Sequence, residues 1–543
     1  MNDRLLGRRA GRWGRITLAF VSCLALTGTL SAWADDDHEG DDDNGKPRFA
    51  VPRATCGSED HPETDLQGQV SAALRASGFK GFNCNLKLLG QSRGDGGNWQ
   101  STEFKDRHGH VCAYHTTAYT TANRSHTGVP VIDLTNPEKP TPTTYLTTTS
   151  MLDPWESLKV NERRRLLGAD NGHNGGFAPL PGNKGPANLD GGGPEVDIYD
   201  VSGDCRYPQL LASASVSQGL DANGFPEVVG HEGSWAPDGL TYYGGDLFHG
   251  LYYAVDTANP REPKMITKWT PGFANVHGLS ISDDGKRGYF VSLDSGVSLT
   301  DPNVKLSNGL LIYDLSEVQA RKKNPQVTLI SKLFWKDGSG AQHTIPVSIG
   351  GKPYIIHVDE AGSGGFSSDA QRKAACAAGL PPYPMPRIID VSDEKNPKIV
   401  SRIALETHDP ANCAKVLPDL VGLGIFTYGS HYCSVDDKHN ATTLACGFFN
   451  SGIRVFDIRN PKRPREIAYY NPAGTKTASA GANHVTTGQW VSGGPDWCST
   501  QMHLDAKRGT LWTMCQDNGL LMLKFEHGVW PFEDSSTPPG QQN

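Results

Sequence analysis

The sequence predicts an all-β fold, namely a seven-bladed β-propeller built from four-stranded antiparallel blades. A short sequence motif recurs along the chain, as in residues 452–464. In this motif an apolar run ends in Asp, and a Pro-rich turn follows. Two further strand patterns, joined by turn residues, precede each copy of the motif. Gly and Pro are abundant, at 62 and 36 of 543 residues, and helical periodicity is scarce, as expected of turn-rich β architecture.

The motif itself predicts the third and fourth strands of each blade. Its apolar run is short, β-branched and aromatic, which indicates a buried strand, and the run after the turn alternates like a half-exposed edge strand. The repeat period is somewhat above the usual ~40–50 residues, which is typical of propeller blades with loop insertions. The predicted third strands are residues 129–133, 195–200, 251–256, 310–314, 387–390, 453–457 and 520–525.

The two ends of the repeated region predict how the ring closes. Residues 84–90 look like the fourth strand of a blade, yet no three strands precede them. The last repeat, at 519–525, has a third strand and no convincing fourth. We therefore expect the N-terminal strand to complete the last blade, which would remove the open edges of the ring. The predicted propeller domain spans residues 56–530.

The apolar-x-apolar-Asp strand resembles the repeat of the LVIVD-repeat family of exported bacterial proteins. The resemblance extends from about Asn83 to Phe525. It implies a β-propeller fold. It implies little about activity, because that family has no settled general function.

The N-terminal sequence predicts that the protein is exported. Residues 1–34 have the pattern of a signal peptide, with Arg-rich residues before the apolar run 16–30 and an Ala32-Trp33-Ala34 cleavage site. Arg8-Arg9 leaves the choice between the Sec and twin-arginine routes open. Residues 35–55 and 531–543 are expected to be disordered tails. No other stretch reaches the ~18 apolar residues of a membrane span, so we expect a periplasmic or secreted protein without a transmembrane segment.

Ten cysteines follow the leader, and an even number in an exported chain favours disulfides over a metal-thiolate site. Cys433 and Cys446 flank one predicted hairpin, and Cys498 and Cys515 flank the next, so each pair is expected to be bonded. The other pairs cannot be deduced. The net charge is −8 with no basic stripe, which argues against nucleic acid as a partner.

Four histidines stand just before the predicted first strands of four consecutive blades. First strands line the central channel, so these imidazoles are expected to converge at the channel mouth, on the face that carries the long loop insertions. Imidazole suits copper, iron or zinc, and acidic residues that end second strands, Glu360 among them, would supply nearby carboxylates. The four are His231, His277, His343 and His431, and further histidines expected on this face are His173, His249 and His484.

Three functions stay open from the sequence. The first is a metal-dependent oxidoreductase, with the four histidines as ligands and Glu232 as a proton-transfer group. The second is a non-catalytic scaffold that binds a protein partner or a small-molecule ligand, with the histidines donating to backbone carbonyls of neighbouring blades. The third is a metal-free hydrolase or lyase, which needs an acid–base pair such as Asp294 with His277. The Asp that ends each third strand is interpreted as a turn residue.

Overall fold

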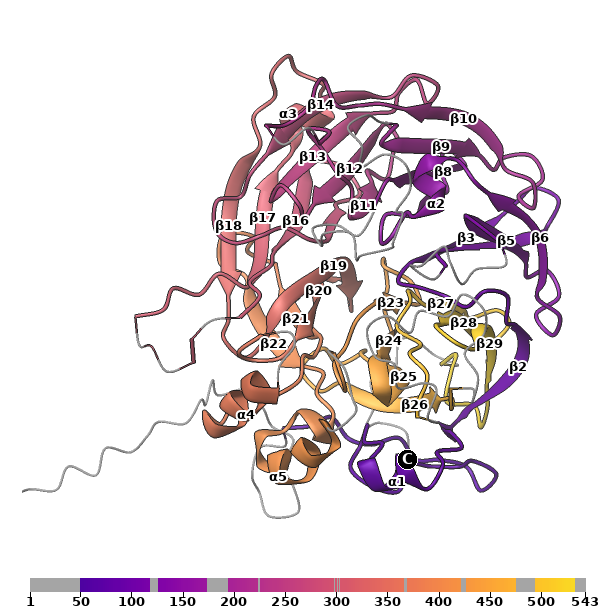
Figure 1. Cartoon of the computed structure of the whole chain (residues 1–543), viewed down its shortest axis with the longest axis vertical. Coiled ribbons are helices and arrows are strands. Elements are labelled where there is room, and N and C mark those ends of the chain that lie inside the picture. Colours follow the sequence, from indigo (N-terminus) through magenta and orange to yellow (C-terminus); the bar gives the residue numbers. More distant parts are fainter. Residues whose placement is uncertain are drawn as a thin grey trace, which may run out of the picture. The chain divides into compact units, whose positions relative to one another are not determined.

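The computed structural model describes residues 49–117, 126–172, 194–222, 225–296, 298–299, 301, 303–365, 369–420, 426–474 and 494–532. Within them the chain forms seven antiparallel sheets that follow one another around a ring, a seven-bladed β-propeller as predicted (Figure 1). The predicted leader, most of the acidic tail and nearly all of the C-terminal tail lie outside the described residues.

The first four blades follow the chain order. Blade one consists of β3 (Ser101–Lys105), β4 (Val111–His115), β5 (Val129–Asp133) and β6 (Thr141–Leu146). Blade two consists of β7 (Lys159–Asn161), β8 (Leu166–Asp170), β9 (Val196–Asp200) and β10 (Gln209–Ala214). Blade three consists of β11 (Glu232–Trp235), β12 (Thr241–Asp246), β13 (Leu251–Asp256) and β14 (Lys264–Trp269). Blade four consists of β15 (Leu279–Ile281), β16 (Arg287–Ser292), β17 (Gly309–Asp314) and β18 (Thr328–Phe334).

Of the remaining three blades, the last two include strands from the N-terminal segment. Blade five consists of β19 (Ser339–Ile349), β20 (Lys352–Ala361), β21 (Arg387–Asp390) and β22 (Lys398–Arg402). Blade six consists of β23 (Cys433–Val435), β24 (Thr443–Phe448), β25 (Gly452–Asp457) and β26 (Arg465–Asn471), with β1 (Phe82–Cys84) added as a fifth strand beside β26. Blade seven consists of β27 (His503–Asp505), β28 (Thr510–Cys515), β29 (Gly519–Phe525) and β2 (Leu86–Ser92).

The first strand of each blade lies innermost. First strands of neighbouring blades contact one another at β3 and β7, at β7 and β11, at β11 and β15, at β15 and β19, and at β23 and β27. Side chains at the starts of these strands are therefore brought together from different blades, and this geometry positions the site.

Apolar side chains pack between neighbouring sheets and hold the ring together. One such core joins Ile356 and Ile388 of blade five to Leu444 and Phe456 of blade six, all with no exposed surface. Full burial of a side chain of this size stabilises the fold by about 1.5–3 kcal/mol. Each blade shares such a core with its neighbours, because a single sheet cannot cover both of its faces.

The Asp residues that end the third strands are turn residues, as predicted. In each one a carboxylate oxygen accepts the backbone N–H two residues later, at donor–acceptor distances of 2.7–3.1 Å. This Asx turn stops the strand and directs the chain into the fourth strand. The six are Asp133, Asp200, Asp256, Asp314, Asp390 and Asp457.

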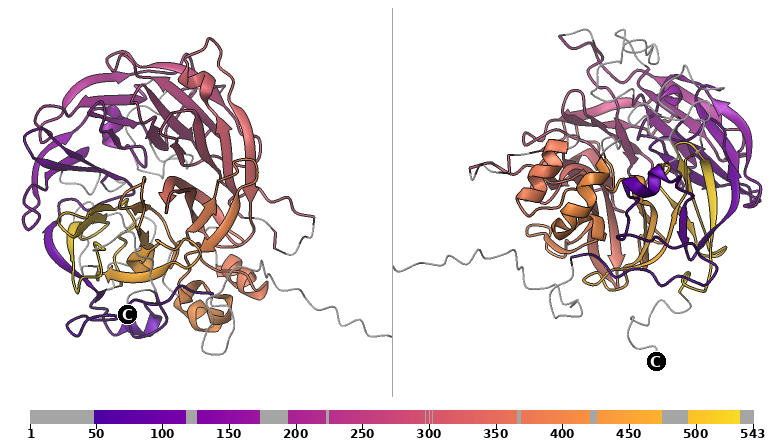
Figure 2. Two further views of the ribbon diagram at one scale, coloured as in Figure 1. Left: turned by 180° about the vertical axis from the view of Figure 1, so that it is seen from behind. Right: turned by 60° about the horizontal axis from the view of Figure 1, so that its bottom comes forward.

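The N-terminal segment crosses from blade six to blade seven. β1 runs antiparallel to β26, and β2 runs antiparallel to β29. The buried Arg454 guanidinium holds this segment, because its Nη2 donates to Glu63 Oε2 at 2.7 Å while its Nη1 donates to Glu466 Oε1 at 2.9 Å. Figure 2 shows the indigo N-terminal segment running beside the orange strands of blade six.

The helices are short and lie outside the blades. They are α1 (Ala72–Ala76), α2 (Thr149–Leu152), α3 (Ser316–Gln319), α4 (Asp369–Ala377) and α5 (Cys413–Val416). Helix α4 lies between β20 and β21, the second and third strands of blade five. Among the described residues, no helix is long and apolar enough to cross a membrane.

Five disulfides cross-link the described residues. The predicted bonds Cys433–Cys446 and Cys498–Cys515 are both confirmed, and the first joins residues that face each other directly across β23 and β24. The bonds that the sequence could not assign are Cys56–Cys84, Cys112–Cys205 and Cys376–Cys413.

Candidate functional site at the histidine cluster

Three of the four predicted histidines meet at the start of the inner strands. His231 precedes β11, His277 precedes β15 and His431 precedes β23, and Glu156, three residues before β7, joins them. All four side chains are buried, with at most 3% of each residue exposed. We call these four residues the histidine cluster.

The ligand atoms of Glu156, His231 and His277 all lie within 4.8 Å of one another. The Nε2 atoms of His231 and His277 lie 2.8 Å apart, and Glu156 Oε2 lies 3.1 Å from the first and 2.9 Å from the second. His431 Nε2 lies 3.3 Å from the other carboxylate oxygen of Glu156. In a four-coordinate site with metal–ligand bonds of ~2.0–2.2 Å, neighbouring ligand atoms are roughly 3.3 Å apart, so the spacing of the Glu156, His231 and His277 atoms is close to that of three ligands of one small cation.

Backbone carbonyls fix the orientation of two of the rings. His277 Nδ1 lies 3.2 Å from the carbonyl oxygen of Ala341, and His431 Nδ1 lies 2.9 Å from that of Ser499. A carbonyl oxygen can only accept, so each Nδ1 carries a proton and donates. Each Nε2 then faces the Glu156 carboxylate with a lone pair, unless a second proton sits there.

A second carboxylate completes the surroundings. Glu360, near the end of β20, lies with Oε2 3.3 Å from His431 Nε2 and Oε1 3.7 Å from His277 Nδ1. Glu360 is 7% exposed. Two carboxylates and three imidazoles therefore share a volume from which water is largely excluded.

The charges of the histidine cluster depend on one another. Burial alone would lower the pKa of His277, but the Glu156 carboxylate beside it raises that pKa to about 9. Burial likewise opposes the charge on His431, while hydrogen bonds to Glu156 and Glu360 raise its pKa to about 10. Burial lowers the pKa of His231. Burial would raise the pKa of Glu156, yet the three imidazoles hold it well below the usual range. Positive charge on His277 and His431 thus balances the buried carboxylate of Glu156.

His343 does not join the cluster, which corrects the predicted set of four. Strand β19 begins at Ser339, so His343 lies inside the strand rather than before it, beyond a bulge between Ala341 and His343. Its Nδ1 pairs with the Gln342 side chain and its ring stacks on Tyr432 at 4.7 Å. A bulge re-aims the side chains that follow it, which accounts for the difference.

Glu232 lies directly beside the cluster. It follows His231 in the chain, is 2% exposed and accepts a hydrogen bond from Gln342 Nε2 at 3.4 Å. Its carboxylate occupies the space where a Cβ on Gly278 would stand, so the glycine after His277 is required for this packing. Burial raises the pKa of Glu232 to about 8.

Lys159 provides a cation on the channel side. It begins β7, its Nζ donates to Gln501 Oε1 at 2.8 Å, and the same Nζ lies 5.6 Å from the centre of the Tyr432 ring. Burial lowers the pKa of Lys159 to about 8. Glu232 and Lys159 therefore both titrate close to neutral pH.

Asp294 and His249 lie in turns apart from the cluster. The carboxylate of Asp294 accepts from Ser307 Oγ and from the Gly296 N–H, whereas the carboxylate that contacts His277 Nε2 belongs to Glu156. The expected pairing of Asp294 with His277 is thus not formed among the described contacts. His249 Nδ1 lies 2.6 Å from Asp246 Oδ2 within its own turn. His173 and His484 fall outside the described residues.

Six aromatic side chains cover the histidine cluster on one side. The Trp99 ring lies 5.0 Å from His431, the Phe449 ring 5.2 Å from His431, and the Trp155 ring 5.9 Å from His231, between ring centres. These residues form a packed group separate from the cores between blades. We call it the aromatic cluster, and its members are Trp99, Trp155, Phe426, Tyr432, Phe449 and Trp497.

Known proteins resemble the chain only distantly. No family model matches the chain, and no curated protein matches it. Solved structures with a similar fold include two proteins provisionally named 6-phosphogluconolactonases. The one from Bacteroides uniformis is 12% identical over 76% of this chain and 91% of its own, and the one from Bacteroides fragilis is 11% identical over 76% and 93%, each with a TM-score of 0.45. A protein from Lactobacillus plantarum is 11% identical over 73% and 87%, with a TM-score of 0.42.

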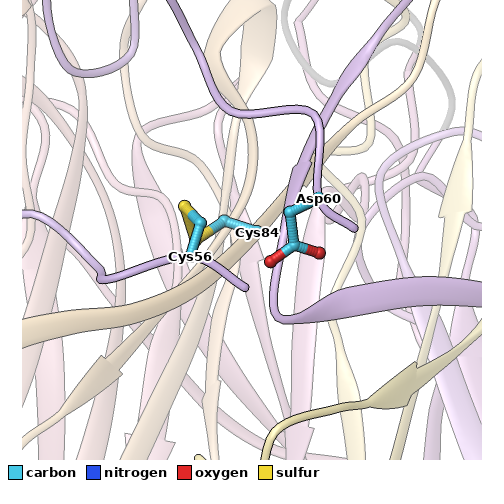
Figure 3. Close-up of side chains that lie close together, drawn as sticks. All are labelled: Cys56, Asp60 and Cys84. Carbon is cyan, nitrogen blue, oxygen red and sulfur yellow. A yellow bond between two sulfur atoms is a disulfide. The ribbon is translucent and has the colours of Figure 1, made fainter. Parts of the chain in front are cut away.

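Other groups of metal-binding residue types are explained by the fold. Cys56 and Cys84 form a disulfide next to Asp60, as Figure 3 shows, so their sulfurs are not free thiolates. The carboxylate of Asp60 accepts backbone N–H groups from Gly57 and Asn85 at 2.7 and 2.9 Å. The sulfurs next to Asp496 are likewise bonded to each other.

A partly exposed group near the outside of blade one is also satisfied locally. Asp106 accepts the backbone N–H groups of His108 and His110, and Asp204 is held by two bonds from Arg206, each 2.8 Å long. An open hollow of about 530 Å³ lies where the N-terminal segment meets blades six and seven, lined by residues such as Lys87, Tyr470 and His527. No member of the histidine cluster lines it.

The carboxylate Glu156 could not be found by aligning the blades on histidine. Blade two supplies a Glu instead of a His at the mouth of the channel, three residues before its first strand. The stretch Trp155-Glu156 before a strand was the available signal. Glu360, by contrast, was expected from its place near the end of a second strand.

Proposed function

We propose that this protein binds one transition-metal ion at the histidine cluster and uses it in catalysis as an oxidoreductase. His231, His277, His431 and Glu156 would be the ligands. The observation that carries the proposal is that the Nε2 atoms of His231 and His277 and the carboxylate of Glu156, all buried, lie 2.8–3.1 Å from one another, with His431 Nε2 3.3 Å from the other oxygen of that carboxylate. A metal ion would place positive charge beside this buried carboxylate, as protons on His277 and His431 also would.

The chemistry of the ligands favours copper, iron or zinc. Imidazole nitrogen suits these borderline metals, and geometry together with metal availability decides among them in the cell. The backbone carbonyls that accept from His277 and His431 Nδ1 are the usual outer partners of metal-binding histidines. Glu232, beside the cluster, would be positioned to exchange protons with a bound ligand.

Metal content tests the proposal. Protein purified from its native compartment should contain one copper, iron or zinc ion per chain by elemental analysis. His277→Ala should abolish that content, whereas His343→Ala, which changes a buried histidine of the same channel, should retain it. Metal-free wild-type protein that is fully active, or equal metal content in the two variants, would end the proposal.

We further propose that the protein acts in the periplasm or outside the cell, as a member of the LVIVD-repeat group. Five disulfides support an oxidising compartment, because such bonds do not persist in a reducing cytosol. Detection of the protein in a periplasmic or culture-medium fraction, with residues 1–34 removed, tests this. A cytosolic protein with free thiols would contradict it.

A metal-free hydrolase or lyase is the second candidate. It is favoured by the two groups with pKa values of about 8, the Glu232 carboxyl and the Lys159 ammonium, which could act as general acid and base near neutral pH. Protons on His277 and His431 would then supply the positive charge. Hydrolytic activity that survives complete chelation and disappears in Glu232→Gln would favour this candidate over the first.

A further inference from the structure

The aromatic cluster packs directly against two histidines of the histidine cluster. It is built from residues that precede first strands or follow a second strand in several blades, the same positions that supply the histidines. Trp99 is its central member, with its ring 6.1–6.4 Å from those of Trp155, Phe426, Phe449 and Trp497. The apolar cores between the blades are formed by other groups of residues, so the blades do not depend on this aromatic packing.

Two members of the aromatic cluster have unusual backbone conformations. Trp155 has φ of +47° and Phe426 has φ of +70°, in the left-handed region that bulky residues rarely adopt. Thr427, next to Phe426, has φ of +43°. Each such residue costs on the order of 1–3 kcal/mol, and strain of this kind gathers at functional sites because the surrounding structure must impose it.

The same two aromatic residues are the partly exposed members of the cluster. Trp99, Tyr432, Phe449 and Trp497 are at most 3% exposed, while Trp155 and Phe426 are only half-buried. A buried polar atom also faces this region: Trp99 Nε1 is buried and has no hydrogen-bond partner among the described residues. A ligand that entered past Trp155 and Phe426 could accept that hydrogen bond.

We propose that the aromatic cluster is the substrate-binding part of the site and that the substrate is an uncharged small molecule with an aromatic or similarly flat apolar group. Flat rings stack favourably with aromatic side chains, in addition to the gain from burying apolar area. A charged group would lose its hydration against these rings, and the ammonium of Lys159 already lies 5.6 Å from the centre of the Tyr432 ring, so a cationic ligand would meet like charge there. The inference rests on the proposed function only in placing the reacting end at the histidine cluster.

Three probes of the same size but different charge test the substrate class. Benzyl alcohol, benzoate and benzylamine share one ring and are neutral, anionic and cationic at pH 7. Binding of each to the full metal-loaded protein can be measured by ligand-observed NMR. Benzyl alcohol should bind at least tenfold more tightly than either charged probe. Equal or tighter binding of benzoate or benzylamine would overturn the inference.

Substitutions at the strained positions locate the binding. Asparagine accepts the left-handed conformation, so Trp155→Asn and Phe426→Asn remove the ring without breaking the backbone. Each should weaken benzyl alcohol binding at least fivefold. Phe248→Asn, which changes an exposed Phe in the turn between β12 and β13, should not. Unchanged affinity in both test variants would contradict the inference.

Failure of this inference and failure of the proposed function give different results. If the protein holds no metal but binds benzyl alcohol in a manner lost in Trp155→Asn, the aromatic site stands and the metal proposal falls. If metal is present at one ion per chain and the charged probes bind as well as the neutral one, the metal proposal stands and the substrate class is wrong.

Discussion

His231 Nε2 and His277 Nε2 lie 2.8 Å apart, although 46 residues separate them in the chain and they belong to different blades. Two neutral rings at this distance share one hydrogen bond, yet both Nε2 atoms also face the same carboxylate oxygen of Glu156. The propeller therefore brings together groups that either share protons or hold a cation between them. Which of the two occurs decides the chemistry of the site.

Glu156→Gln should weaken metal binding strongly. The substitution keeps the size of the side chain and removes its negative charge from beside two imidazoles 2.9 and 3.1 Å away. We expect a loss of affinity larger than the ~10–100-fold that removal of an outer partner costs. Competition with a chelator of known affinity measures it.

Glu360→Gln is the matched comparison for that prediction. Glu360 touches His431 and His277 at 3.3 and 3.7 Å, but it is not among the proposed ligands. Its removal should cost no more than ~10–100-fold in affinity. If Glu360→Gln proved more harmful than Glu156→Gln, the assignment of the carboxylate ligand would be wrong.

Gly278→Ala should destabilise the protein and disturb the site together. A Cβ at this position would overlap the carbonyl oxygen of Gln342 and the carboxylate of Glu232, and the backbone that carries His277 would have to shift. Overpacking of this kind costs about 1–3 kcal/mol in the free energy of unfolding. Denaturant unfolding and metal affinity are the two measurements.

Gly203→Ala serves as the control for the glycine prediction, because a Cβ there meets open space. Its unfolding free energy should change by no more than about 0.5 kcal/mol. A tolerated Gly278→Ala with unaltered metal affinity would show that the packing between Gly278 and Glu232 does not hold His277 in place.

Asp337 should make stability depend on pH in the acid range. Burial opposes its charge, but Arg387 and Arg402 lower the pKa of its carboxyl to about 2, below the value of 3.8 expected in the unfolded chain. A group whose pKa falls on folding contributes stability above pH 4, and the contribution disappears as the pH falls from 4 toward 2. The shift corresponds to about 2 kcal/mol.

Asp337→Asn should therefore be less stable than wild type by about 2 kcal/mol at pH 7, with a smaller difference at pH 2.5. Urea unfolding at both values measures this. Glu262→Gln, which changes an exposed carboxylate 3.9 Å from Lys264, should show little difference at either pH. A deficit in Asp337→Asn that stayed constant from pH 7 to 2.5 would mean that the charge of Asp337 is not what stabilises the fold.

The fold could be predicted from the sequence because one strand pattern is repeated. The Asp at the end of each third strand marks the same turn in six blades, and each predicted third strand agrees with the structure to within one residue, as for β9 at Val196–Asp200. The unassigned disulfides, such as Cys112–Cys205, bridge distant parts of the chain, and no local pattern encodes them.

The site could be predicted only where the blades share a register. His231, His277 and His431 each stand directly before an inner strand or one residue away from it, so their convergence followed from the repeat. Strand β19 begins four residues before His343 and contains a bulge, and hydrogen-bonding irregularities of this kind leave no clear trace in the sequence. Glu156 was missed because its blade supplies a different residue type.

The most direct test of the account is the position of the metal. Crystals of the protein grown with copper, iron or zinc should show one anomalous-scattering peak at the metal's absorption edge, with the Nε2 atoms of His231, His277 and His431 about 2.0–2.2 Å away. A peak only elsewhere, or no peak between these three rings in protein that is active, would contradict the central claim.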